Sequence, residues 1–229
     1  MTAAPIHIAG ERLMLDPAGA LAWPVRRTLV LGDLHLEKGS HFARRGVFVP
    51  PYDTRETLER LALVLRRWRP ERLVLLGDSF HDAEGSARLQ QADHATLLRM
   101  LSGIAVIWVL GNHDPVPPGT LPGEAVEELR DGPLTFRHVG QPRAGAEVSA
   151  HFHPKATMPT RAGGVTRPCF LSDGRRVLLP AFGAYTGGLD IGDPAIGALF
   201  PRGGRAFLLG RDRLYSMPAA PLRGMRPAL

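Results

Sequence analysis

Three apolar segments of the chain end at a glycine that is followed by aspartate, asparagine or histidine. Carboxylate oxygens, amide oxygens and imidazole nitrogens are side-chain atoms that bind divalent metal ions. The carboxyl ends of parallel strands meet at one edge of an α/β sheet, where binding sites are built. Glycine lets the backbone turn sharply there, so the pattern predicts a metal site. The segments and the residues that follow them are 28–31 with Asp33 and His35, 72–76 with Asp78, and 104–110 with Asn112, His113 and Asp114.

Two later segments supply further histidines. A short extended segment from Leu134 ends at His138, and another from Val148 runs into His151-Phe-His153. Alternate residues of a strand point to opposite faces, but a turn just after the strand can aim both histidines inward. Each motif alone has a simpler explanation, because such motifs are common in turns and His138 could be a surface residue. The order of all the motifs along the chain favours one shared site.

The ordered series Asp-x-His, Gly-Asp, Gly-Asn-His-Asp, His and His-x-His resembles the calcineurin-like binuclear metallophosphoesterase superfamily over residues 30–154. That superfamily usually has glycine at the position of Ala150, and we expect alanine to require only a slight backbone adjustment. The resemblance implies an α/β fold, a four-layer α/β/β/α sandwich. It also implies an enzyme that hydrolyses phosphoester bonds.

By the same resemblance, two divalent metal ions share Asp78 and hold a bridging hydroxide as the nucleophile. Manganese is the expected metal, with iron and zinc as alternatives that also accept nitrogen and oxygen ligands. His113 is expected to protonate the leaving oxygen, and Asp114 is expected to orient the His113 ring. One metal is assigned Asp33, His35, Asp78 and His153, and the other Asp78, Asn112, His138 and His151.

A narrower resemblance covers more of the chain. Four strings are similar to the ligase-associated DNA-repair endonucleases called PdeM, whose genes lie beside those of ATP-dependent DNA ligases and helicases. The resemblance implies DNA as substrate and a functional association with such a ligase and helicase. The strings are residues 32–39, 76–82, 151–154 and 180–188, the last of which lies outside the metal motifs.

Several other side chains could contact a nucleic acid. Arginine binds phosphate with two parallel hydrogen bonds, and aromatic rings, including that of Phe48, stack on unpaired bases. The alternative is a solvated basic loop, and His81 could simply cap the loop before Asp82. His7, His41 and His94 are expected to be ordinary surface residues. The candidate substrate contacts are Lys38, Arg44, Arg45, Tyr52, His81 and Tyr185.

The composition sets further limits. The formal net charge of +6 suits a polyanionic partner, although enrichment in arginine, proline, glycine and alanine can also reflect a GC-rich genome. The single cysteine, Cys169, excludes an intrachain disulfide and a thiolate metal cage, and we expect it to be buried. No apolar stretch of about 18 residues occurs and no secretion signal is evident, so we expect a cytoplasmic protein without a membrane span.

The elements expected around the motifs alternate between strands and helices and then become β-rich. A capping box of Asp53 and Glu56 predicts a helix from residue 53 that ends before Pro70, and residues 41–51 are expected to form a loop. We expect one domain over residues 1–217 and a loose tail over residues 218–229. Turns are expected at 172–174 and 211–212. The other expected elements are a hairpin at 6–15, a helix at 92–101, and strands at 134–139, 147–150, 165–171, 175–179, 206–209 and 214–217.

These observations favour a metal-dependent phosphodiesterase, specifically an endonuclease that acts on single-stranded or flapped DNA in repair. A phosphatase or pyrophosphatase acting on a small nucleotide is the first alternative. Such enzymes usually carry a capping insertion, and no long insertion separates the motifs here. A non-catalytic scaffold of the same fold is the second alternative, and such proteins usually lose ligands that this chain keeps.

Overall fold

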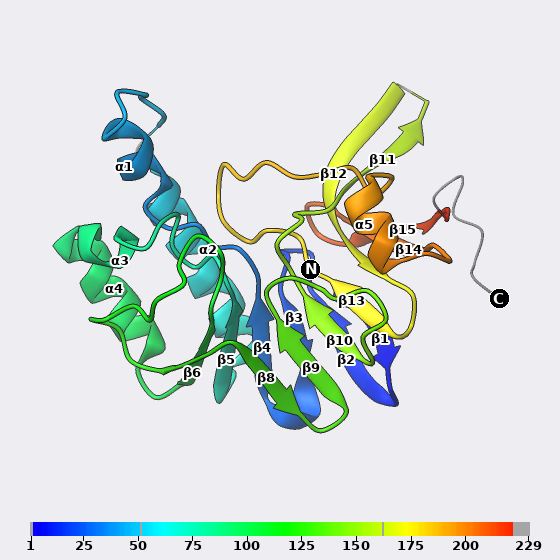
Figure 1. The fold of residues 1–229 in the computed structure, drawn as a ribbon, viewed down its shortest axis with the longest axis horizontal. Coiled ribbons are helices and arrows are strands. Elements are labelled where there is room, and N and C mark those ends of the chain that lie inside the picture. The colour runs from blue at the N-terminus through cyan, green and yellow to red at the C-terminus, as the bar shows by residue number, and fades with distance from the viewer. Residues whose placement is uncertain (1, 51, 162, 222–229) are drawn as a thin grey trace.

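The computed structural model describes residues 2–50, 52–161 and 163–221. Two β-sheets lie face to face, with helices on their outer faces (Figure 1). The first sheet has seven strands in the order β1 to β7, antiparallel from β1 to β4 and parallel from β4 to β7. Its strands are β1 (Ala4–Ile8), β2 (Glu11–Leu15), β3 (Leu21–Trp23), β4 (Thr28–Leu31), β5 (Arg72–Leu76), β6 (Ala105–Val109) and β7 (Glu124–Val126), with a 3-10 turn η1 (Pro24–Arg26) before β4.

The second sheet has the strand order β15-β14-β12-β13-β10-β9-β8, and β11 pairs with β12 outside this path. The predicted turns are confirmed, because residues 172–174 join β12 to β13 and residues 211–212 join β14 to β15. The strands are β8 (Glu128–Asp131), β9 (Leu134–Arg137), β10 (Glu147–Ser149), β11 (Lys155–Thr160), β12 (Gly163–Ser172), β13 (Arg176–Leu178), β14 (Gly204–Leu209) and β15 (Leu214–Ala219).

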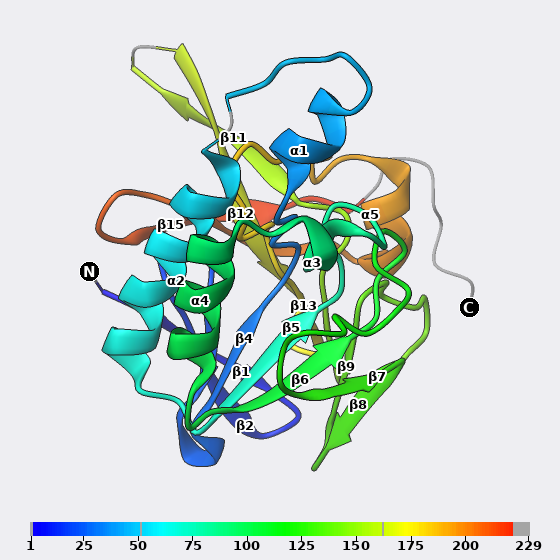
Figure 2. The ribbon, with the colours of Figure 1, turned by 90° about the vertical axis from the view of Figure 1, so that its left-hand side faces the viewer.

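Helices α2 (Asp53–Trp68) and α4 (Gln91–Leu101) cover the outer face of the first sheet (Figure 2). Leu61 of α2 and Leu97 of α4 pack on Leu29 and Leu73 of the sheet. These helices lie in the crossovers β4-α2-β5 and β5-α4-β6, which place the carboxyl ends of three parallel strands at one edge.

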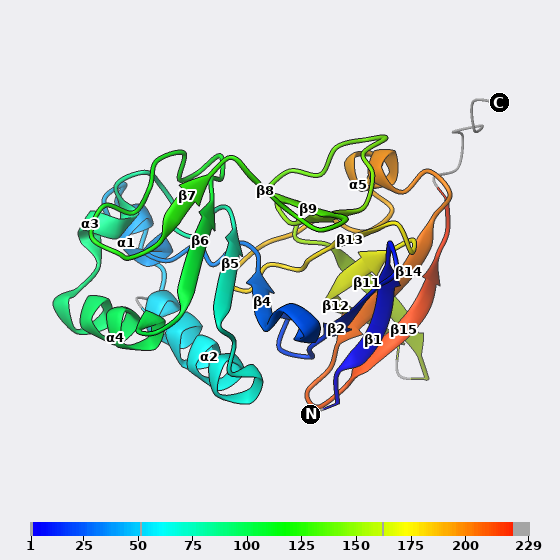
Figure 3. The ribbon, with the colours of Figure 1, turned by 90° about the horizontal axis from the view of Figure 1, so that it is seen from below.

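The second sheet and its covering helix form the other two layers, because alternate side chains along each strand point to opposite faces of the sheet. Val30 faces the second sheet and packs with Val148 and Phe170 in a core between the sheets. Cys169 faces away from that core, toward helix α5 (Pro194–Leu199). Figure 3 shows the first sheet between its covering helices and the second sheet. The predicted four-layer sandwich is confirmed.

Three local predictions are wrong, each because tertiary contacts decide the structure. Helix α1 (Lys38–Ala43) occupies part of the predicted loop, and a further short helix, α3 (Gly85–Arg88), lies against it. The capping box does not form, because Asp53 is the first residue of α2 and its carboxylate accepts the backbone N–H of Gly39 at 3.0 Å. Strand β15 continues to Ala219 into the predicted tail, whose residues 222–229 lie outside the described residues.

No helix within the described ranges is both long enough and apolar enough to span a membrane.

Candidate metal centre

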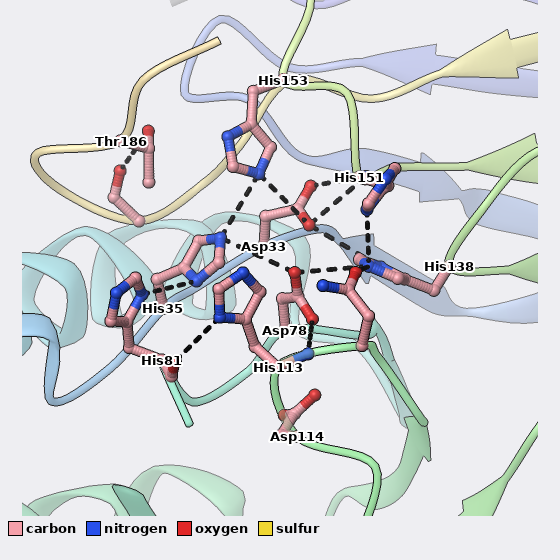
Figure 4. A network of polar contacts seen from close by, with 12 residues as sticks. Asp33, His35, Asp78, His81, His113, Asp114, His138, His151, His153 and Thr186 are labelled. Atoms are coloured by element: carbon pink, nitrogen blue, oxygen red, sulfur yellow. Dashed lines mark hydrogen bonds and ion pairs between the residues drawn. The ribbon is translucent and has the colours of Figure 1, made fainter. Parts of the chain in front are cut away.

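The predicted metal ligands converge from the strand ends of both sheets (Figure 4). Asp33 and His35 follow β4, Asp78 follows β5, and Asn112 follows β6. The second sheet contributes its histidines from the loops after β9 and β10, namely His138, His151 and His153. The site therefore lies at the edge where the two sheets meet.

Five of the predicted ligands adopt a left-handed backbone conformation, which is uncommon for residues other than glycine. Such conformations cost free energy and persist where the surrounding structure fixes them, which is frequently at functional sites. Here they turn consecutive ligand side chains toward one point. The φ angles are 53° at Asp33, 44° at His35, 46° at Asp78, 74° at His151 and 46° at His153.

One group of possible ligand atoms comprises Asp33, His35 and His153. The Nε2 atoms of His35 and His153 are 3.3 Å apart, and Nε2 of His153 is 3.4 Å from Oδ1 of Asp33. Burial, followed by the neighbouring His153, lowers the pKa of His35 to about 2. The His35 imidazole is thus neutral, which is the form that binds metal.

A second group comprises Asp78, His138 and His151. Nε2 of His138 is 3.1 Å from Nδ1 of His151 and 3.3 Å from Oδ2 of Asp78. Oδ1 of Asn112 lies 2.9 Å from the same Nε2 atom. His138 could not be distinguished from a surface residue in the sequence, but it is buried and its Nδ1 lies 2.8 Å from the carbonyl oxygen of Leu76.

Asp78 lies between the two groups. Its Oδ2 atom is 3.9 Å from Nε2 of His35 as well as 3.3 Å from Nε2 of His138. Burial acts to raise the pKa of Asp78, but its hydrogen bond with His138 and the charge of that ring hold the pKa below its usual range. A buried carboxylate among convergent imidazole nitrogens is a donor set that fits divalent cations.

The His113 ring lies beside these groups and is exposed. Its Nδ1 atom is 2.9 Å from the carbonyl oxygen of His81, and its backbone N–H donates to Oδ1 of Asp78 at 2.9 Å. The predicted role of Asp114 in orienting this ring is wrong. The Asp114 carboxylate accepts the backbone N–H of Phe80 at 3.1 Å and points away from His113 (Figure 4). Burial raises the pKa of Asp114 to about 6.

His81 lies at the site, so it does more than cap the loop before Asp82. Its Nδ1 atom is 3.2 Å from Nδ1 of His35, and its ring stacks on that of His113 with centroids 5.0 Å apart. His35, His81 and His113 form a third group of possible ligand atoms. Burial, followed by the charges of His113 and Lys38, lowers the pKa of His81 to about 4.

The prediction that His41 is an ordinary surface residue is wrong. Its ring meets that of His81 edge to face, with centroids 4.8 Å apart, and its Nδ1 is 2.5 Å from Oδ2 of Asp82. Arg88 donates to both oxygens of Asp82 at 2.7 and 2.6 Å. The Arg88–Asp82–His41 chain thus supports His81 from outside the metal ligands. No sequence spacing indicates these contacts, because they depend on how α1 packs.

The other candidate substrate contacts lie around the rim. Nζ of Lys38 donates to the carbonyl oxygen of Tyr185 at 2.9 Å, which joins α1 to the loop after β13. Arg44 and Arg45 are both exposed, and Arg44 forms an ion pair with Glu84. Tyr52 and Tyr185 are also exposed.

The string at residues 180–188 packs directly on the ligand loops. Gly183 donates its N–H to the carbonyl oxygen of Asp33 at 3.0 Å, and a Cβ atom on Gly183 would lie 2.0 Å from the backbone oxygen of Leu34. A Cβ atom on Gly188 would lie 2.1 Å from the carbonyl oxygen of His153. The string therefore supports the loops of Asp33 and His153 together.

The methyl group of Ala150 fits against Gly32, in the turn that follows β4. A Cβ atom on Gly32 would lie only 2.6 Å from the Cβ of Ala150, so the missing side chain of Gly32 makes room for the alanine methyl group.

Comparison with known proteins agrees with this geometry. A family model described as calcineurin-like phosphoesterase matches residues 26–173, the segment that carries all seven predicted ligands. The chain belongs to this family. Among solved structures it is similar to the Pseudomonas putida nuclease MPE, with 29% sequence identity and a TM-score of 0.73, covering 94% of this chain and 100% of that chain. No curated protein sequence matches the chain. The protein is a metal-dependent phosphoesterase, a hydrolase.

Proposed function

We propose that the protein is a manganese-dependent DNA endonuclease of the ligase-associated PdeM kind, acting on single-stranded or flapped DNA in repair. The convergence of two groups of ligand atoms on Asp78, with the exposed His113 beside them, carries the proposal. The similarity to a nuclease over nearly the whole chain supports a nucleic acid as the substrate.

The ligand roles follow from the two groups. Asp33, His35 and His153 would hold one cation, His138, His151 and Asn112 would hold the other, and Asp78 would contact both. Two divalent cations held by these residues would supply a water of lowered pKa and would polarise the phosphate oxygens. Manganese is proposed from the narrower sequence resemblance, since the mixed nitrogen and oxygen ligands would suit iron or zinc as well.

His113 is the proposed general acid. Nδ1–H of His113 donates a hydrogen bond to the carbonyl oxygen of His81, so the proton that is exchanged with the substrate belongs to Nε2. A phosphodiester of DNA leaves as an alkoxide, which is a poor leaving group unless it is protonated. Stacking of His81 on His113 holds the ring in place while it remains exposed to substrate.

The substrate contacts are proposed from the rim. Arg45 is available to bind phosphate, and the exposed rings of Tyr52 and Tyr185 can stack on unpaired bases. Lys38 is proposed to position the Tyr185 loop through its hydrogen bond to the Tyr185 carbonyl. A functional association with an ATP-dependent DNA ligase and a helicase completes the proposal and rests on the sequence resemblance alone. A cytoplasmic location is also proposed, as expected from the sequence composition.

Circular single-stranded DNA tests the proposal, because only an endonuclease can open a circle. We expect metal-stripped protein to linearise the circle when manganese is restored, and to hydrolyse bis-p-nitrophenyl phosphate under the same conditions. Efficient hydrolysis of a nucleotide without cleavage of the circle would overturn the proposal and indicate a phosphatase that acts on small molecules. Hydrolysis of neither substrate with manganese, iron or zinc would favour a scaffold.

A further inference from the structure

The hairpin of β11 and β12 projects from the body of the protein. Residues 155–160 of β11 pair with residues 163–168 of β12, and at the base of this hairpin Lys155 also forms a bridge to Asp190. The last four residues of β12, Cys169 to Ser172, pair with β14 inside the second sheet, and Leu171 and Ser172 also pair with β13. The base of the hairpin is anchored, because Ala156 is fully buried and Met158 packs on the core that includes α5, whereas residues 159–161 and 163–167 are exposed. A two-stranded ribbon with no further strand beside it is marginally stable in water, so the exposed outer part of the hairpin is open to a binding partner.

The hairpin surface is basic. Residues 154–172 include one lysine and two arginines and contain neither aspartate nor glutamate. Arg161 at the tip and Arg167 on β12 are both exposed, and neither has an ion-pair partner among residues 2–50, 52–161 and 163–221. Unpaired, exposed guanidinium groups suit an anionic partner such as the phosphates of a nucleic acid.

The hairpin begins at the candidate metal centre. Strand β11 starts at Lys155, two residues after His153, and α1 starts at Lys38, three residues after His35. The Nε2 atoms of His35 and His153 are 3.3 Å apart, so the two projections leave the site from adjacent ligands. Figures 1 and 2 show α1 and the hairpin rising from the same end of the molecule, and Figure 1 shows them on opposite sides of it.

We propose that the β11–β12 hairpin is a second DNA-binding arm, which contacts backbone phosphates through Arg161 and Arg167 on the side of the site opposite α1. The inference rests on the proposed endonuclease function and extends it. A DNA strand would then be held on both sides of the scissile phosphate. Small esters would not reach the hairpin, so its arginines would affect polymer binding alone.

The test compares two variants that each remove two exposed arginines. Arg161→Gln with Arg167→Gln changes the hairpin. Arg12→Gln with Arg66→Gln is the matched control, because Arg12 lies on β2 and Arg66 in the last turn of α2, both far from the strand ends that carry the ligands. Binding of a labelled single-stranded oligonucleotide is measured by fluorescence anisotropy across a salt series, with calcium in place of manganese to prevent cleavage.

Each phosphate contact on a single strand contributes roughly 0.7 to the slope of log affinity against log salt. We expect the hairpin variant to lose about 1.4 of that slope, to cleave DNA more slowly, and to hydrolyse bis-p-nitrophenyl phosphate at the wild-type rate. Equal slopes in the hairpin and control variants would overturn the hairpin proposal while wild-type cleavage of DNA left the proposed function intact. A wild-type protein that neither binds nor cleaves DNA would overturn both.

Discussion

Oδ2 of Asp78 lies 3.3 Å from Nε2 of His138, although the two residues follow strands of different sheets. Asp78 is fixed by the turn after β5, and His138 by its contact with the carbonyl oxygen of Leu76 at the end of the same strand. The two sheets pack on each other through a shared core, and this packing places the two halves of the candidate metal centre next to each other.

Asp78→Ala should empty both metal positions, since this carboxylate is the only predicted ligand shared by both sets. Elemental analysis after reconstitution with manganese should find close to two ions per chain in the wild type and far fewer in the variant. Metal removal from the wild type should also lower its melting temperature, because ligands that bind only the folded state stabilise it. Asp212→Ala, an exposed aspartate, is the control. Normal metal content and activity in Asp78→Ala would contradict the bridging role.

His113→Ala should retain metal and lose roughly 10²–10⁴ in the rate of DNA cleavage, the usual contribution of a general acid. The loss should be much smaller on bis-p-nitrophenyl phosphate, because p-nitrophenolate leaves without a proton. The measurement is kcat on both substrates together with metal content, with the exposed His7→Ala as control. Equal losses on the two substrates would indicate that His113 binds the phosphate instead.

Gly183→Ala should weaken metal binding although residue 183 carries no ligand atom. Its Cβ would lie 2.0 Å from the backbone oxygen of Leu34, so the loop that presents Asp33 and His35 must shift. Crowding of this kind costs about 1–3 kcal/mol of stability. Gly187→Ala is the matched control, because nothing lies within 4 Å of its added Cβ. Manganese titration and thermal unfolding of both variants measure the effect, and identical behaviour would rule out a supporting role for Gly183.

The ligand set could be predicted from the sequence because each ligand follows a recognisable strand end. Asp33 and Asp78 come directly after glycines that close β4 and β5, and the local pattern fixes both their type and their place. The prediction for Asp114 fails because adjacency in sequence does not fix direction. In the turn after β6 its carboxylate points to the backbone of Phe80 while His113 points to the site.

Contacts that depend on packing between distant segments could not be predicted. His41 reaches His81 only because α1 forms, and α1 is held by tertiary contacts such as the hydrogen bond from Gly39 to Asp53. The need for glycine at position 183 likewise becomes visible only when its loop lies on Asp33 and Leu34.

Cys169 should not react with thiol reagents in the folded protein. The residue is fully buried, and burial, followed by the charge of Asp190, raises the pKa of its thiol to about 12. The thiolate is the reactive form, so its fraction near pH 8 is negligible. A disulfide-exchange reagent should label no thiol in native protein and one thiol per chain in denaturant. Rapid labelling of the native protein would show that the layer between the second sheet and α5 opens readily.

Arg45 should contribute more to DNA binding than its neighbour Arg44. Both are exposed in the segment after α1, but Arg44 forms an ion pair with Glu84, so binding a phosphate would require that pair to break. Arg45→Gln should reduce the salt dependence of single-stranded DNA affinity by roughly 0.7 in slope, the value for one phosphate contact. Arg44→Gln should reduce it by less, and the adjacent position makes it the matched control. Hydrolysis of bis-p-nitrophenyl phosphate should be unchanged in both variants. A larger loss of slope in Arg44→Gln would show that DNA displaces Glu84 and that Arg44 is the phosphate contact.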